Sequence, residues 1–597
     1  MGRPESGYTK KLLAPWAYSM DVSGIRILVI GDDTRSALAI VRSLWRAGAE
    51  VSLASERAES PVVRSRAVRK VYALPSSAAS ISAWSRRIKE IFLKNEFDAV
   101  LPATETAWLG LMRMRDFLPE SALRFLPDEK AFECVYRKSK TLELARSLSI
   151  PVPESHLFTN ETDAFSFLEK RGFREPYVGK PDVSKVWAGE YRVDLGVRVL
   201  ETKESAQSFL RSTIPFAPVL IQARVPGIGI GQEFLASNGE IILSFEHERI
   251  HEPAGSGGSS YRKSVLLHAG IFECSRALIR ALKWNGVCMI EYRWDPKTDM
   301  FWMMEINGRF WGSLPLAIRA GADFPAALIF SELGDAKPSD STYRIGLFAR
   351  NLVKDFRWVF ETRGIFGVFK EGAIALFRFF SGQEIWDTFQ WNDPRPFFAE
   401  WKVAAGKAFR RVPALAHRII EYPFFFLFGA LMRTRRIRRI CAILTKNPRV
   451  LFVCYGNIAR SPFAERSARK IFSEAGIPGF SFSSRGYYPE SGRAPALLTS
   501  ITAGEFGVSL DSHRSKIVFR GDIERAGAVF CMDRENYQAL IKGFPQVKEK
   551  LFLLESLVSS DPQMEIPDPW MRSYEHIRSA FVHIQKSIKH LRDRMQA

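Results

Sequence analysis

The sequence predicts an α/β protein of several domains, because two distant regions each begin with a buried strand, a turn and an amphipathic helix. The first is "IRILVIGDD" followed by "TRSALAIVRSLW", and the second is "RVLFVCYGNIARSP". Between them lie strands interrupted by glycines, which are typical of an α+β domain. A chain of 597 residues is also too long for one hydrophobic core.

The order of these patterns predicts five segments. Residues 1–24 are expected to be a flexible tail, and residues 25–127 alternate strands and helices as in a Rossmann-like domain. The "GDD" turn lacks G-x-G-x-x-G, which disfavours a dinucleotide site. Residues 128–335 are expected to form an α+β domain, and residues 336–447 a basic, aromatic, helical connector. Residues 448–597 are expected to form a doubly wound parallel sheet.

The cysteine usage and the N-terminal sequence indicate the cellular compartment of this basic protein. Its formal net charge is +20, and its six cysteines are scattered without a C-x-x-C pair. Scattered cysteines favour a reducing compartment. The N-terminus has no secretory pattern, so we expect a cytoplasmic protein.

The basic charge is concentrated in the connector. Residues 401–450 contain twelve Lys or Arg and one acid, around the apolar run Glu421 to Met432 and the arginine-rich "RTRRIRR". The run is shorter than the ~20 residues needed to span a bilayer. Two interpretations stay open: a helix lying on the anionic inner face of the membrane, or a buried inter-domain helix with a solvated basic flank. No nucleic-acid-reading module accompanies the charge, which disfavours a specific nucleic-acid partner.

The stretch "VCYGNIARSP" predicts an anion-binding loop with a nucleophile. If residues 451–453 form a strand and Pro462 starts a helix, the intervening N–H groups and the helix dipole converge on one point. Arg460 can bind two phosphate oxygens at once, and this field favours the thiolate form of Cys454. Ser461 can donate its hydroxyl to that thiolate.

A thiolate that attacks phosphorus also needs an acid for the leaving oxygen. Near the C-terminus, "EIPDPW" offers Asp568 between two prolines that restrict the loop. Taken alone, a cysteine after a strand usually belongs to the core and a D-P pair is usually a turn. Their occurrence together points to a cysteine phosphatase.

Residues 448–597 resemble a low-molecular-weight protein tyrosine phosphatase. The family loop C-x-G-N-x-C-R-S is matched by Cys454, Gly456, Asn457, Arg460 and Ser461, with Tyr455, Ile458 and Ala459 completing it. The family's "SHR" segment is matched by Ser512, His513 and Arg514. Its "MD" strand end is matched by Met532 and Asp533, and its acid loop by Asp568 and Pro569.

The resemblance implies that Cys454 forms a phosphocysteine, that Arg460 stabilises the transferring phosphoryl group, and that Asp568 acts as acid and then base. It implies that Asn457 and His513 brace the loop, that no cofactor is needed, and that the substrate is a phosphotyrosine protein or another phosphomonoester. Ala459 replaces a second family cysteine that can protect the nucleophile as a disulfide. Trp570 and Met571 stand where tyrosines are common in the family.

A second group of polar residues lies before residue 336. Glu305, Asn307 and Arg309 alternate along one face of a predicted strand, and Glu291 lies on the strand expected beside it. Carboxylate and amide oxygens suit Mg²⁺ that bridges nucleotide phosphates. Lys138 and Lys180 are point charges for phosphates, and the glycine-rich loop at residues 255–260 could close over them.

Residues 25–335 resemble the ATP-grasp superfamily, in its carboxylate–amine ligase branch, through "K…GIPVP"-like, "KP", "IQ…PG" and "EIN-R-WGS" segments. The resemblance implies that ATP is bound by Lys138, Lys180 and Gln222, and that Mg²⁺, or Mn²⁺, is held by Glu291, Glu305 and Asn307. Arg309 occupies the place of a catalytic arginine. ATP would convert a carboxylate to an acylphosphate, which an amine or thiol then attacks. Ala223 replaces the usual acid near the adenine, and Ser149 replaces a glycine.

Three functions follow from these assignments. The first is a bifunctional enzyme, an ATP- and Mg²⁺-dependent ligase joined to a cysteine phosphatase. The second is an active phosphatase regulated or scaffolded by an inactive nucleotide-binding part, which the substitution at Ala223 favours. The third keeps the ligase and reduces the C-terminal part to a phosphate-binding module, but Cys454 and Asp568 argue against it. The sequence does not identify the carboxylate and amine substrates.

Overall fold

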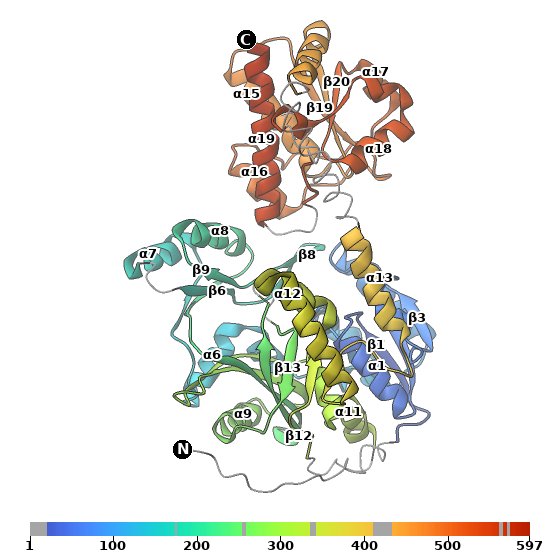
Figure 1. The fold of residues 1–597 in the computed structure, drawn as a ribbon, viewed down its shortest axis with the longest axis vertical. Coiled ribbons are helices and arrows are strands. Elements are labelled where there is room, and N and C mark those ends of the chain that lie inside the picture. The colour runs from blue at the N-terminus through green and yellow to red at the C-terminus, as the bar shows by residue number, and fades with distance from the viewer. Residues whose placement is uncertain are drawn as a thin grey trace. The chain divides into compact units, whose positions relative to one another are not determined.

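The structure is a computed structural model that describes residues 21–172, 176–253, 258–334, 342–409, 433–559, 565–569 and 574–596. The chain forms two compact units, Met1–Ala405 and Gly406–Ala597 (Figure 1). The predicted apolar run at residues 421–432, and Trp570 and Met571, lie outside the described residues.

The N-terminal unit begins with a four-stranded parallel sheet in the order β3-β2-β1-β4. Its central strand β1 and its edge strand β4 are almost entirely apolar and buried, because helices cover both faces of the sheet, whereas the other edge strand, β3, is mostly exposed. The strands are β1 (Arg26–Ile30), β2 (Glu50–Ser55), β3 (Lys70–Ala73) and β4 (Ala99–Pro102), and the helices are α1 (Ser36–Arg46), α2 (Ile81–Lys94) and α3 (Glu105–Arg113).

Two short helices lead into a second, antiparallel sheet in the order β5-β10-β6-β9. The helices are α5 (Glu129–Tyr136) and α6 (Lys138–Ser147), after the single turn α4 (Glu120–Leu123). The sheet consists of β5 (Ser155–Phe158), β6 (Tyr177–Pro181), β9 (Arg198–Leu200) and β10 (Val219–Ala223), packed against α7 (Glu161–Arg171) and α8 (Lys203–Thr213). A hairpin of β7 (Lys185–Ala188) and β8 (Tyr191–Asp194) projects from it.

A seven-stranded sheet forms the centre of the unit, in the order β15-β14-β11-β12-β13-β16-β17. Its strands are β11 (Ile228–Ser237), β12 (Glu240–His251), β13 (Tyr261–Ser264), β14 (Gly286–Trp294), β15 (Phe301–Asn307), β16 (Phe348–Arg350) and β17 (Glu384–Trp386). Helices α9 (Ala269–Ala281), α10 (Leu314–Ala320) and α11 (Phe324–Leu333) pack against it. Strands β16 and β17 fall in the segment that we expected to be a helical connector, so its first part extends this sheet.

Two helices end the N-terminal unit, α12 (Leu352–Phe380), which breaks at Gly364, and α13 (Arg395–Phe409). No single helix in the described ranges is long and apolar enough to cross a membrane. The pair α10 and α11 reaches that length and composition together, but it bends by 78° and its residues are buried in the core of the unit.

The C-terminal unit is a parallel sheet in the order β19-β18-β20-β21, as the sequence predicts. Its strands are β18 (Arg449–Cys454), β19 (Ser481–Gly486), β20 (Ala528–Cys531) and β21 (Leu551–Leu553). One apolar cluster joins the sheet to α15 (Arg460–Glu474), α16 (Leu497–Gly504) and α19 (Tyr574–Gln596), and another joins it to α17 (Arg520–Arg525) and α18 (Arg534–Gly543).

A helix at residues 433–446 precedes the first strand of this unit. Its apolar side chains Ile437, Ile440 and Leu444 are buried in the first cluster. On its other faces, Arg433 donates to the carbonyl of Val558 at 3.0 Å, and Arg439 donates to the carbonyl of Glu549 at 2.7 Å. The described part of the arginine-rich segment is therefore an integral helix of this unit.

Candidate functional sites

The loop between β18 and α15 forms a tight cradle. Cys454 ends the strand, Arg460 begins the helix, and Asn457 between them has a left-handed backbone with φ of 49°. The neighbouring strand comes very close at Gly486, where a Cβ atom would lie 2.7 Å from the carbonyl oxygen of Tyr455 and 2.9 Å from the amide of Asn457. Only glycine fits at this point without moving the loop.

The sulfur of Cys454 lies inside this cradle and is 3.0 Å from Ser461 Oγ. The backbone amide of Asn457 donates to the same sulfur at 3.3 Å. A hydroxyl, an amide and a helix N-terminus thus surround one sulfur atom, which stabilises a sulfur anion. The arrangement is the one predicted from the spacing of the loop.

Asn457 holds the loop through every polar atom of its side chain. Its Nδ2 donates to Ser461 Oγ at 2.9 Å and to Ser484 Oγ at 3.0 Å, and its Oδ1 accepts from the amide of Lys516 at 2.8 Å. His513 Nε2 lies 2.8 Å from the Asn457 carbonyl oxygen and must donate to it. Burial lowers the pKa of His513, so the neutral ring with its proton on Nε2 is favoured.

Arg460 is buried and contacts two carboxylates. Its Nη1 donates to Asp533 at 2.6 Å and to the carbonyl of Ile566 at 2.8 Å, and its Nη2 lies 2.9 Å from Asp568 Oδ2. Burial alone lowers the pKa of Arg460, but Cys454, Asp568 and Asp533 outweigh that effect and raise it. The predicted clamp, nucleophile and acid therefore converge on one point.

Aromatic rings border the mouth of the cradle. The exposed ring of Tyr455 meets Tyr487 and Tyr488 edge-on, with centroid distances of 5.2 and 5.4 Å. Arg493 stacks over Tyr488 at 3.8 Å and donates to the carbonyl of Gly456 at 2.8 Å. Tyr487, Tyr488 and Arg493 were not predicted from the sequence, although "YY" directly after a strand was a usable sign.

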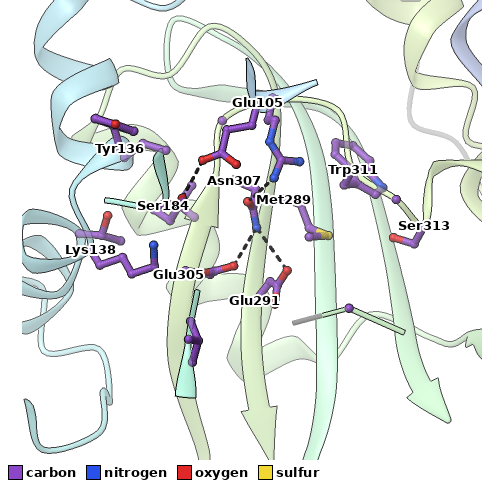
Figure 2. A pocket seen from close by; sticks show the side chains of 18 of the residues that line it. Glu105, Tyr136, Lys138, Ser184, Met289, Glu291, Glu305, Asn307, Trp311 and Ser313 are labelled. Atoms are coloured by element: carbon purple, nitrogen blue, oxygen red, sulfur yellow. Dashed lines mark hydrogen bonds between the residues drawn. The ribbon is translucent and has the colours of Figure 1, made fainter. Parts of the chain in front are cut away.

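The N-terminal unit contains a cavity of about 320 Å³ beside the middle of β14 and the C-terminal end of β15. Glu291 and Glu305 are direct partners across these strands, and Asn307 Nδ2 donates to both carboxylates, at 3.2 and 3.3 Å (Figure 2). Arg309 Nη2 in turn donates to Asn307 Oδ1 at 3.2 Å. The three residues predicted from the alternation and Glu291 on the neighbouring strand are therefore connected in one hydrogen-bonded group.

The predicted lysines lie near the same carboxylates. Lys138 starts α6 and lines the cavity, while Lys180 is buried on β6. Burial lowers the pKa of Lys180 to about 8, although Glu305 opposes this effect. Burial raises the pKa of Glu305, but Lys138 and Lys180 outweigh it and hold that pKa below its ordinary value. Gln222 is not among the described residues that line the cavity, and its amide donates to Ser155 Oγ at 2.9 Å.

Arg249 is a site residue that was not predicted from the sequence. It extends from β12 to Glu291 on β14, where Nη2 and Oε2 are 2.6 Å apart. It can cross the intervening strand β11 because residue 229 is a glycine, at which a Cβ atom would lie 2.6 Å from the Cδ of Arg249. His247 on β12 lies over Gly231 of β11, where a Cβ atom would collide with its ring, and pairs with Glu233 of that same strand at 2.9 Å. The alternating glycines of "GIGIG" were the usable signal.

The donor set of the cavity fits a divalent cation that also binds phosphate. Across the described parts of the chain, no group of three or more His, Cys, Asp or Glu side chains is placed to hold a metal ion by itself. Glu291 and Glu305 nevertheless present two carboxylates side by side, which are hard oxygen ligands for Mg²⁺. The remaining ligands would be phosphate oxygens and water, as is usual for Mg²⁺ at nucleotide sites.

Comparisons with known proteins agree with the geometry of the C-terminal site. Residues 449–597 match the family model of low molecular weight phosphotyrosine protein phosphatase. A protein of that name from Pongo abelii is 35% identical over 127 residues, which cover 20% of this chain and 78% of the relative. A protein-arginine-phosphatase from Geobacillus stearothermophilus is 28% identical over 148 residues, 25% of this chain and 96% of the relative.

The structure is also similar to that of an L-amino acid ligase from Bacillus licheniformis, with 16% identity and a TM-score of 0.42 over 55% of this chain and 79% of the other. The relationship predicted for the C-terminal domain is confirmed: through residues 449–597, the chain belongs to the low molecular weight phosphotyrosine protein phosphatase family.

Proposed function

We propose that the C-terminal unit hydrolyses phosphomonoesters through a phosphocysteine. Cys454 Sγ attacks phosphorus, the P–O bond to the leaving group breaks, and Asp568 supplies the proton that this oxygen needs. Water then attacks phosphorus while Asp568 takes its proton, the S–P bond breaks with its electron pair staying on Cys454 Sγ, and phosphate leaves the regenerated thiolate. The observation that carries the proposal is the convergence of Cys454, Arg460 and Asp568 on one cradle.

The rim supports an aromatic ester as substrate. Tyr455, Tyr487 and Tyr488 offer ring edges on which a phosphotyrosine ring can pack. Because relatives include both tyrosine and arginine phosphatases, the test compares a phosphotyrosine peptide with the same peptide carrying phosphoarginine. We expect a higher kcat/KM for phosphotyrosine and loss of both activities in Cys454→Ser. Hydrolysis that survives Cys454→Ser would contradict the proposal.

For the N-terminal unit, we propose an ATP-grasp ligase that joins a carboxylate to an amine or thiol through an acylphosphate. Glu291 and Glu305 would hold Mg²⁺, which when bound neutralises phosphate charge. Asn307 would join them once its amide turns Oδ1, which here accepts from Arg309, toward the ion. Lys138 and Lys180 would bind phosphate oxygens, and Arg309 would stabilise the transferring phosphoryl group. The hydrogen-bonded group around Asn307 supports this assignment, because it gathers the carboxylates and the arginine in one cavity.

The test measures ADP release with pools of carboxylates and amines. We expect release that needs both co-substrates and is lost in Glu305→Gln, while the surface variant Glu154→Gln, whose side chain is half exposed, retains it. The second candidate is a nucleotide sensor that regulates the phosphatase, favoured by Ala223 in place of the usual acid. Stabilisation by ATP and Mg²⁺ without turnover on any pool would support the sensor.

A further inference from the structure

The second half of α12, residues 365–380, directs charged side chains toward the unit and apolar side chains outward. Two of its three charged residues, Glu371 and Arg378, contact the unit: Glu371 accepts from Arg350 at 3.3 Å and from Arg363 at 2.7 Å. Arg378 stacks over the ring of Phe348 at 4.1 Å and donates to the hydroxyl of Tyr261. Polar anchors thus hold this helix to the sheet, which leaves its apolar side to face outward.

The outward side carries four phenylalanines. The exposed fractions of Phe366, Phe369, Phe377 and Phe380 are 85%, 70%, 71% and 75%. Their spacing of three, eight and three residues repeats the helical period, so they form one stripe, to which Ile365 and Leu376 add half-exposed side chains. We call these six residues the aromatic face. At 1.5 Å per residue, it is roughly 24 Å long, and soluble surfaces seldom keep so large an apolar stripe bare.

The charges around the aromatic face are positive. Among the described residues 365–380, the only acid is Glu371, which faces inward, whereas Lys370 is exposed. Beside Phe380 and the exposed Trp391 lies a hollow of about 560 Å³, lined by Arg46, Arg319 and Arg344. Two acids in its lining, Glu384 and Asp387, are already paired with the buried arginines Arg350 and Arg262.

We propose that the aromatic face inserts into the head-group region of an anionic lipid bilayer, with the arginine-lined hollow taking lipid phosphates. Phenylalanines next to lysine and arginine suit this boundary, because apolar rings reach the acyl chains while cations stay at the phosphates. A second copy of the chain fits less well. In a two-fold symmetric pair the same patch meets itself, which would oppose Lys370 and the arginines of one copy to those of the other.

The break in α12 allows this orientation. Gly364 has the non-helical angles φ of 67° and ψ of −168°, which break the helix. Residues 365–380 therefore do not continue the axis of the first half. The contact is interfacial, in keeping with the finding that no single described helix is long and apolar enough to cross a membrane. It also differs from the membrane contact predicted for residues 401–450, because it uses residues of the N-terminal unit.

The experiment is sedimentation of the full chain with vesicles. Vesicles of phosphatidylcholine alone are compared with vesicles that also contain phosphatidylserine, at low and at high salt. The phosphatidylserine content is about 30 mol%, on the order of the anionic fraction of natural membranes. The test variant is Phe366→Gln/Phe369→Gln/Phe377→Gln, and the matched control is Leu93→Gln/Phe117→Gln, which changes apolar residues of similar exposure elsewhere on the unit. Arg344→Gln tests the hollow. Melting curves of the full chain monitor the fold of the N-terminal unit, in which all of these substitutions lie.

We expect the chain to bind anionic vesicles in a salt-sensitive manner, the triple variant to bind at least about ten-fold more weakly, and the control to bind like wild type. Arg344→Gln should weaken binding about two- to five-fold. Three results would overturn the proposal: no binding by wild type, unchanged binding by the triple variant, or a concentration-dependent dimer that the triple variant abolishes without any effect of vesicles. The second would assign vesicle binding to another segment, and the third would assign the face to a second copy.

Discussion

Arg460 Nη2 lies 2.9 Å from Asp568 Oδ2, so the proposed acid contacts the group proposed to clamp the phosphate. A bound phosphoryl group would compete with Asp568 for that guanidinium. Substrate binding would therefore release the carboxyl group to face the leaving oxygen, because the arginine cannot serve both anions with the same N–H.

Asp568→Asn should lower kcat most for esters with poor leaving groups. We expect a loss of about 10²- to 10³-fold with phenyl phosphate, the usual contribution of a general acid, and a smaller loss with p-nitrophenyl phosphate, whose leaving group needs less protonation. Steady-state rates with both esters check this. The exposed Asp511→Asn is the control, and equal losses on both esters would argue against an acid role.

Gly486→Ala should damage the phosphatase without unfolding it. The added Cβ would lie 2.7 Å from the carbonyl oxygen of Tyr455, so the loop must shift by several tenths of an ångström. We expect kcat/KM to fall at least about ten-fold because the cradle no longer fits the phosphoryl group. Gly504→Ala, where nothing lies within 4 Å of the new Cβ, should keep wild-type activity. If both variants behave alike, the close approach at Gly486 is not critical.

Ala459→Cys should change the response to peroxide. The wild-type loop has no second thiol, so oxidised Cys454 is expected to proceed to acids that thiols do not reduce. In the variant a disulfide with Cys454 would trap the first oxidation product, and dithiothreitol should then restore most of the activity. Recovery of activity after a peroxide pulse measures this, and Cys441→Ser controls for other thiols. Full recovery of the wild type would contradict the prediction.

Glu246→Gln should stabilise the N-terminal unit at high pH. Burial raises the pKa of Glu246 to about 7, despite hydrogen bonds from Gln232 at 2.7 Å and the amide of His268 at 2.9 Å. The folded chain holds the proton more tightly than the unfolded chain, so wild-type stability falls as pH rises from 4.5 to about 7. The gain in free energy of unfolding should approach ~3 kcal/mol at pH 8 and vanish near pH 4.5. Melting curves across this range check it, with the exposed Glu240→Gln as control.

The sequence predicted the α/β class, both parallel sheets and the phosphatase loop because each depends on contiguous residues. The loop from Cys454 to Ser461 needs only a strand, a turn and a helix in order. Glu291 and Glu305 were also recoverable, since period-two alternation marks one face of neighbouring strands. Arg249 was missed because its contact crosses a whole strand, and that crossing depends on glycines whose partners only the sheet order reveals.

The helix at residues 433–446 sets where the phosphatase can be cut from the chain. The family match begins at residue 449, yet Ile437, Ile440 and Leu444 belong to the core of this unit. A fragment starting at residue 448 would lose three buried aliphatic side chains, each worth about 1.5–3 kcal/mol of burial. An expression fragment should therefore begin before residue 433, since the smallest piece that folds well extends beyond the boundary that the family defines.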